Sequence, residues 1–196
     1  MALKDIIKKV EKNKSFKSFI KANPDYYLAH CFSMIDEGKK DKEEKAKGKG
    51  TGAKKQAVKW ELGYYSDKAD KLVVFEISPK VVMRDAENAL KRDGSINKLD
   101  MAKVKVSLTK ALDICSELMS KNYPGRSVTK NIIVLQNLDG QMYNITLVTL
   151  SFDIINIKID SETGEVISHN LQSIMSLGKW EKGEKAGDSG GKPAAA

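Results

Sequence analysis

The stretch NIIVLQNLDGQMYNITLVTL, residues 131–150, decides the fold class that the sequence predicts. Its two arms, NIIVLQNL (131–138) and MYNITLVTL (142–150), are rich in β-branched and other apolar residues, which favour strands. Asp139-Gly140 stands between the arms, and Asp-Gly between two such runs is a strong signal for a tight β-hairpin. The sequence therefore predicts an antiparallel sheet built around this hairpin.

Segments on both sides extend the hairpin into a helix-plus-sheet unit. Downstream, IINIKID (154–160) predicts a third strand, and EVISHNL (165–171) either extends the sheet or begins a last short element. Upstream, Ser107 is a good N-cap for a helix that Tyr123-Pro124-Gly125 ends. The apolar residues of that helix recur at core spacing: Leu108, Ala111, Leu112, Cys115, Leu118 and Met119. A helix with such a stripe buries it against the face of a sheet.

The first half of the chain repeats this plan. Three predicted strands are YYLAHCFSMI (26–35), VKWELGYY (58–65) and KLVVFEI (71–77). Before them, Leu3, Ile6, Ile7 and Val10 recur at helical spacing, and Ser15 is a candidate cap for a further helical turn that Asn23-Pro24 ends. Between the halves, DAENALKR (85–92) has strong helix formers, and Val104 and Val106 are candidates for an edge strand.

The two halves align with each other. Trp60, Leu62 and Tyr64 match Tyr143, Ile145 and Leu147 at an offset of 83 residues. Val73, Phe75 and Ile77 match Ile155, Ile157 and Ile159 at an offset of 82. We interpret this as an internal duplication. The predicted fold class is α+β, with two tandem units that each pack a helix on a three-stranded antiparallel sheet.

The predicted boundaries follow from composition. The first unit spans 1–83 and includes a flexible Lys/Gly loop at 38–56, where almost no large apolar residue is present to offset the entropy of ordering. The second unit spans 84–177. The tail 178–196 is poor in apolar residues apart from Trp180, and we predict that it is disordered.

Charge and cysteine content narrow the class of protein. Residues 1–59 contain 16 Lys and 8 acids, so the whole formal charge of +8 resides in the first third of the chain. No apolar run approaches the roughly 20 residues of a membrane helix, and MALKDIIKKVEKNK lacks the apolar core of a signal peptide. Cys31 and Cys115 lie in apolar surroundings without a pairing motif, as reduced and buried thiols do. We therefore expect a cytoplasmic protein without membrane association.

The second half resembles a PepSY domain (peptidase propeptide and YpeB). The family's helix start is matched by Val106, Ser107 and Ala111, and its aromatic-x-aliphatic strand by Tyr143 and Ile145. Its closing strand and turn are matched by Ile157, Ile159, Asp160, Thr163, Gly164, Glu165 and Val166. The resemblance covers roughly residues 104–170, and the first half would be a diverged copy in which SPKVV (78–82) replaces the turn. It implies a helix on a small antiparallel sheet (PepSY/cystatin-like) and a non-catalytic module, often one that regulates peptidases or binds ligands outside the cytoplasm.

The closing turn of this motif also has a purely structural interpretation. Asp160 can accept hydrogen bonds from backbone N–H groups across the turn, and Gly164 can supply a positive φ. The turn therefore needs no ligand to explain its residues.

No pattern of catalytic or metal-binding residues is found. The only histidines are His30 and His169, and neither belongs to a metal-binding motif. His30 and Cys31 are adjacent on a predicted strand, so their side chains point to opposite faces and cannot form a thiol–imidazole pair. We predict a protein that is not an enzyme and that has no catalytic residues, cofactor or metal.

The expected function is binding. The predicted strands leave a sheet face or an edge strand that could take a segment of a partner protein or another copy of the chain. We therefore predict a non-enzymatic intracellular binding or scaffolding module. The alternative is weak, non-specific association with nucleic acid or an acidic partner through 38–59. Its candidate contacts are Lys39, Lys40, Lys42, Lys45, Lys47, Lys49, Lys54, Lys55 and Lys59.

Overall fold

A computed structural model describes residues 3–37, 59–84, 87–88 and 96–173 of the chain. The helices are α1 (Leu3–Glu11), α2 (Lys14–Ala22) and α4 (Leu108–Asn122). The strands of the first half are β1 (Tyr27–Asp36), β2 (Trp60–Ser66), β3 (Lys71–Ser78), β4 (Lys80–Met83) and β5 (Glu87–Asn88). Those of the second half are β6 (Val128–Asn137), β7 (Gln141–Thr149), β8 (Asp153–Asp160) and β9 (Val166–Ser173).

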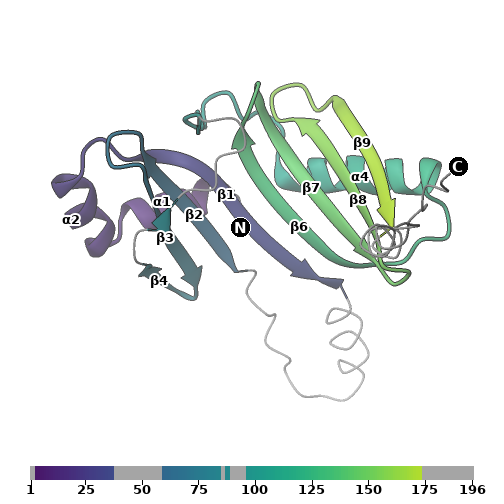
Figure 1. The fold of residues 1–196 in the computed structure, drawn as a ribbon, viewed down its shortest axis with the longest axis horizontal. Helices are drawn as coiled ribbons and strands as arrows, with labels where there is room; N and C mark the ends of the chain where they lie inside the picture. The colour runs from purple at the N-terminus through teal and green to yellow at the C-terminus, as the bar shows by residue number, and fades with distance from the viewer. Residues whose placement is uncertain (1–2, 38–58, 85–86, 89–95, 174–196) are drawn as a thin grey trace, which may run out of the picture.

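All the strands belong to one antiparallel sheet (Figure 1). Its order is β4-β3-β2-β1-β6-β7-β8-β9, and β5 pairs with β3 beside this path. The two halves of the chain meet where β1 pairs with β6, in a register that runs from His30 opposite Gln136 to Asp36 opposite Lys130. The predicted fold class of two tandem helix-plus-three-strand units is therefore wrong, because the strands of both halves form a single sheet.

The pairing of β1 with β6 has a physical cause. In two separate sheets, β1 and β6 would each leave one row of backbone N–H and C=O groups without a strand partner. Because β1 pairs with β2 on one side and with β6 on the other, both rows are satisfied at once. Each of these strands has ten residues, which is long enough for an extended ladder.

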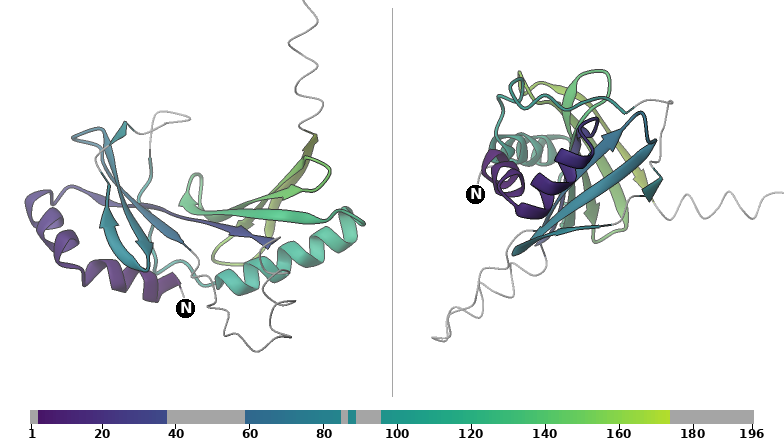
Figure 2. Two further views of the ribbon diagram at one scale, coloured as in Figure 1. Left: turned by 90° about the horizontal axis from the view of Figure 1, so that it is seen from below. Right: turned by 90° about the vertical axis from the view of Figure 1, so that its left-hand side faces the viewer.

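The three helices cover the same face of this sheet (Figure 2). α1 and α2 lie over the half that contains β2 and β3, and α4 lies over the half that contains β7 and β8. The sheet curves so that its two ends rise on the side away from the helices. The buried core lies between the helices and the sheet, and we call the opposite side the helix-free face.

In the first half, Phe16 of α2 anchors the helices to the sheet. Its ring centroid lies 4.9 Å from that of Tyr64 and 5.1 Å from that of Phe75. α2 begins two residues earlier than predicted, because Asn13 and not Ser15 is its N-cap. The Asn13 side-chain oxygen accepts hydrogen bonds from the backbone N–H groups of Ser15 (2.9 Å) and Phe16 (3.4 Å).

In the second half, α4 has the predicted bounds and cap. The Ser107 hydroxyl accepts a hydrogen bond from the Lys110 N–H at 3.2 Å. Two tyrosines attach the ends of the helix: Tyr143 of β7 donates to the Val106 carbonyl at 2.9 Å, and the Tyr123 hydroxyl lies 2.7 Å from His169 Nδ1 on β9. The helix is therefore fixed to the sheet at both ends by polar contacts as well as by its apolar stripe.

The predicted local elements are confirmed in part. All six predicted strands are present, and 165–171 extends the sheet as most of β9. Residues 104–106 are not a strand, since the N–H groups of Lys105 and Val106 both donate to the Ser161 carbonyl. The helix predicted at 85–92 is contradicted at Glu87–Asn88, which pairs with β3, and its other residues lie outside the described part of the chain.

The turn after β8 has the predicted structure. Asp160 Oδ1 accepts hydrogen bonds from the N–H groups of Glu162 (2.7 Å) and Thr163 (2.9 Å), which holds the pKa of Asp160 below its usual value. Gly164 adopts a φ of 84°, a conformation that glycine adopts without strain. The turn is thus explained by its own backbone contacts.

The domain boundaries 1–83, 84–177 and 178–196 stay a prediction. The loop 38–56 and the tail 178–196 lie outside the described residues. Among the described helices, none is long and apolar enough to cross a membrane.

Candidate functional site

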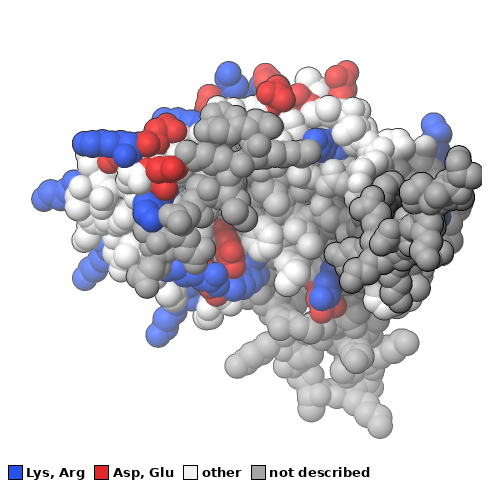
Figure 3. Space-filling view, in the orientation of Figure 1, with Lys and Arg blue, Asp and Glu red and all other residues white. Residues whose placement is uncertain are grey.

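The centre of the helix-free face is apolar. Residues of β1 and β6 that alternate with core residues point to this side, so Phe32 lies opposite Val134 and Met34 lies opposite Ile132. Met34 is 50% exposed, and the other three side chains are half-buried. We call these four residues the central apolar patch. In Figure 3, which views this face, uncharged residues occupy the middle of the region over β1 and β6, and charged residues lie toward its lower end.

A row of amide and hydroxyl side chains borders the patch on β7 and β8. Asn144 lies opposite Val134 and Thr146 lies opposite Ile132, so this row is the next one across the sheet. The Asn156 amide donates to Asn144 Oδ1 at 2.6 Å and to Thr146 Oγ1 at 3.0 Å. The row is ordered by its own hydrogen bonds, yet its remaining donors and acceptors can serve a partner.

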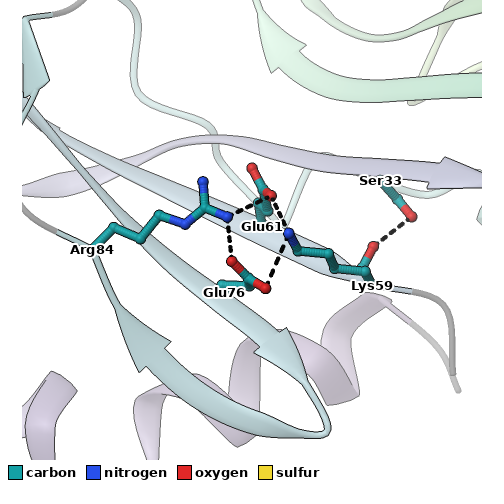
Figure 4. A network of polar contacts seen from close by, with 5 residues as sticks. All are labelled: Ser33, Lys59, Glu61, Glu76 and Arg84. Atoms are coloured by element: carbon teal, nitrogen blue, oxygen red, sulfur yellow. Dashed lines mark hydrogen bonds and ion pairs between the residues drawn. The ribbon is translucent and has the colours of Figure 1, made fainter.

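An ion-pair network borders the patch on the other side (Figure 4). Glu61 of β2 lies directly opposite Glu76 of β3, a pairing of like charges that is unfavourable alone. Lys59 bridges the two carboxylates at 3.1 Å and 3.0 Å, and Arg84 also contacts both. Hydrogen bonds that Lys59 and Arg84 donate lower the pKa of Glu76, and the bonds that Glu76 and Glu61 accept from Lys59 raise the pKa of Lys59. The four charges of this network sum to zero.

This network includes one of the nine lysines that the sequence predicts as contacts for nucleic acid or an acidic partner. Lys59 is the only one of the nine that falls within the described residues, and its ammonium group is bound by two glutamates. Its backbone is fixed as well, because Ser33 Oγ donates to the Lys59 carbonyl at 2.9 Å. Lys39, Lys40, Lys42, Lys45, Lys47, Lys49, Lys54 and Lys55 lie outside the described part of the chain.

The two histidines and two cysteines are not brought together. His30 lies on the helix-free face over Gly63, whereas His169 contacts Tyr123, the C-cap of α4, on the other face. Cys31 and Cys115 are free and buried in the core, so the predicted separation of His30 from Cys31 is confirmed. Within residues 3–37, 59–84 and 96–173, no three His, Cys, Asp or Glu side chains gather in a way that could hold a metal ion.

His30 makes a close contact that the sequence does not reveal. A Cβ atom built on Gly63 would lie 2.2 Å from His30 Cε1, so only glycine leaves room for the imidazole ring. Burial lowers the pKa of His30, and the Glu61 carboxylate partly offsets this shift. The neutral ring therefore extends the uncharged part of the face toward β2.

We expect Gly63→Ala to destabilise the protein because the imidazole must move. Forced repacking of this kind costs about 1–3 kcal/mol, measured as the free energy of unfolding in urea. His30→Ala removes the obstructing ring, so the double variant Gly63→Ala/His30→Ala should recover most of that loss. If the effects of the two substitutions on the free energy of unfolding were strictly additive, the Cβ atom at position 63 and the His30 imidazole would not compete for the same space.

Comparisons with known proteins give one structural likeness. No protein-family model matches the chain, and no curated protein matches it at a significant level. The fold is similar to the crystal structure of a "putative lipoprotein" from Clostridium difficile 630, with a TM-score of 0.46 and 14% sequence identity. The match covers 81% of this chain and 90% of that one.

Proposed function

We propose that this protein is a non-enzymatic binding module that takes a segment of a partner protein on its helix-free face. The observation that carries the proposal is the central apolar patch, which lies between a hydrogen-bonding row and an ion-pair network. Protein interfaces have this anatomy: an apolar centre, depleted of charge, within a polar rim.

The charges of the face favour a polypeptide over other occupants. Nucleic acid binds through an excess of positive charge, whereas both cations of the network are held by glutamates. A protein segment with apolar side chains and a few polar ones would match the patch and its rim without leaving a charge unpaired.

The proposal can be tested with peptides selected from a random display library on the immobilised protein. For a selected peptide, calorimetry should show that Met34→Asp raises the dissociation constant at least about tenfold, because a charge then stands at the centre of the contact. Phe152→Asp is the matched control: Phe152 is 63% exposed in the β7–β8 turn and has a φ of 59°, which Asp tolerates. This control should bind the peptide as the unaltered protein does.

Three results would contradict the proposal. The first is a library that yields no peptide enriched over the bare support. The second is equal affinity of Met34→Asp and Phe152→Asp for the selected peptide. The third is a dimer that Met34→Asp dissociates in sedimentation experiments, which would assign the face to a second copy of the chain instead.

A further inference from the structure

A cavity of about 710 Å³ lies on the other side of the sheet, among α1, α2, the start of β1 and the segment 98–102. Sites for small molecules in proteins range from roughly 300 to 1,000 Å³. The segment 98–102 is held beside β1 because the Leu99 N–H donates to the Leu28 carbonyl at 2.8 Å. The cavity is therefore bounded by regular elements and by an anchored segment.

The inner wall of the cavity is apolar. It consists mainly of side chains from the first-half core and from the anchored segment: Ile7, Phe16, Ile20, Leu28 and Leu99. These five side chains offer no hydrogen-bond partner to a polar molecule, so the part of a ligand that contacts them must be hydrocarbon.

One polar group on this wall, the Tyr64 hydroxyl, can reach a ligand. Tyr64 is 5% exposed and lines the cavity, and its hydroxyl has no hydrogen-bond partner among the described residues. Burial and the nearby Glu11 carboxylate raise the pKa of Tyr64, so the hydroxyl keeps its proton and remains a donor. The hydroxyl is not one of the buried polar atoms that lack a partner, so it is accessible from the cavity and can donate to an acceptor on a ligand.

The rim of the cavity carries more positive than negative charge. Lys4 and Lys8 lie one turn apart on the face of α1 that lines the cavity, and Lys98 belongs to the segment 98–102. No ion pair of these three ammonium groups is recorded within the described residues. Two carboxylates, Glu11 and Asp100, also line the cavity, and Asp100 Oδ1 accepts a hydrogen bond from the Ala102 N–H at 2.9 Å. Because Lys4 and Lys8 precede Glu11 along α1, the positive excess lies toward the beginning of that helix.

We propose that this cavity binds a linear acyl chain with a carboxylate head, which is the chemistry of a free fatty acid. The chain lies against Phe16, Ile20 and Leu28, and the carboxylate lies near Lys4 and Lys8, where it accepts a hydrogen bond from the Tyr64 hydroxyl. The site is separate from the helix-free face, so either proposal can fail while the other stands.

The test uses two amphiphiles that share a chain and differ in the head group, both below their critical micelle concentrations. Calorimetric titration with sodium laurate should give a saturable isotherm with one molecule per protein. Dodecyltrimethylammonium has a chain of the same length and a positive head, and it should bind at least about tenfold more weakly. Nuclear Overhauser contacts should join the laurate chain to the rings of Phe16 and Tyr64.

Charge-reversal variants locate the head group. Lys4→Glu/Lys8→Glu should weaken laurate binding at least about tenfold, and both residues are exposed on α1, where Glu is a good helix former. Lys12→Glu/Lys17→Glu changes the net charge equally at exposed positions that do not line the cavity, so it should bind laurate as the unaltered protein does. Circular dichroism melting curves check that both variants fold.

The proposal is overturned if laurate does not bind below its micelle concentration. Equal binding of both head groups would overturn it as well, because it would indicate adsorption on apolar surface. Equal laurate binding by the two double variants would show that Lys4 and Lys8 do not bind the head group. Overhauser contacts of the chain with residues other than Phe16 and Tyr64 would show that laurate binds outside the cavity.

Discussion

Both cysteine thiols of the folded protein are expected to react with iodoacetamide on the order of a thousandfold more slowly than in the unfolded chain at about pH 8. Burial raises the pKa of Cys31 and of Cys115 from 9.0 to about 12, so the reactive thiolate becomes about a thousandfold rarer. Exclusion of the reagent adds to this protection, because Cys31 is 0% and Cys115 3% exposed. Intact-protein mass spectrometry against time gives both rates.

The reference for this measurement is the same protein in concentrated guanidinium chloride, where both thiols should be labelled rapidly. At intermediate denaturant, labelling of each cysteine should follow the unfolding curve, because reaction requires the core to open. Rapid alkylation of either thiol in the native protein would contradict the burial of that residue. It would also identify which side of the core opens first, since Cys31 lies on β1 and Cys115 on α4.

Local elements were predictable because their signals are local. Asp139-Gly140 between two apolar runs fixes the β6–β7 turn, and the spacing from Ala111 to Cys115 fixes the buried stripe of α4. The sequence indicates Ser15 as the cap of α2 because serine is a good cap residue. Asn13 is equally suited, and the backbone adopts the extended conformation there.

The joining of the two halves was not predictable by the same reasoning. Alternation along a strand indicates which side chains are buried, but it does not specify which strand is the neighbour. The continuous apolar run 132–135 was the available signal, because a strand that is apolar on both faces is typical of the middle of a sheet. The same run supplies Ile132 and Val134 to the central apolar patch. It therefore indicates both that β6 lies in the middle of a sheet and that the helix-free face is apolar there.

The charges of the site could not be assigned from composition. Lys59 was grouped with the lysines of 38–56 because it follows them directly in the sequence. Its partners Glu61 and Glu76 come from two strands, and only the antiparallel register of β2 and β3 places them side by side. A count of charges along the chain therefore overstates the positive charge that the folded surface presents at this position.

Phe75→Ala is expected to lower the free energy of unfolding by about 3–5 kcal/mol. Phe75 is fully buried on β3, and its ring contacts those of Phe16 and Phe19 on α2 and of Tyr64 on β2. The substitution removes the aromatic side chain through which α2 is attached to the sheet. Guanidinium denaturation followed by Trp60 fluorescence, in a Trp180→Phe background, measures the effect in the first half of the chain.

The same variant tests whether the single sheet is a single folding unit. If the β1–β6 pairing makes the two halves cooperative, hydrogen exchange in β7 and β8 should accelerate as much as exchange in β2 and β3, although β3, which carries Phe75, pairs with neither β7 nor β8. Phe152→Ala is the matched control, since it removes an exposed aromatic ring and should change stability by less than about 0.5 kcal/mol. Unchanged exchange in β7 and β8 would instead show that 1–83 and 84–177 unfold independently. The hydrogen bonds between β1 and β6 would then join two units that do not unfold cooperatively.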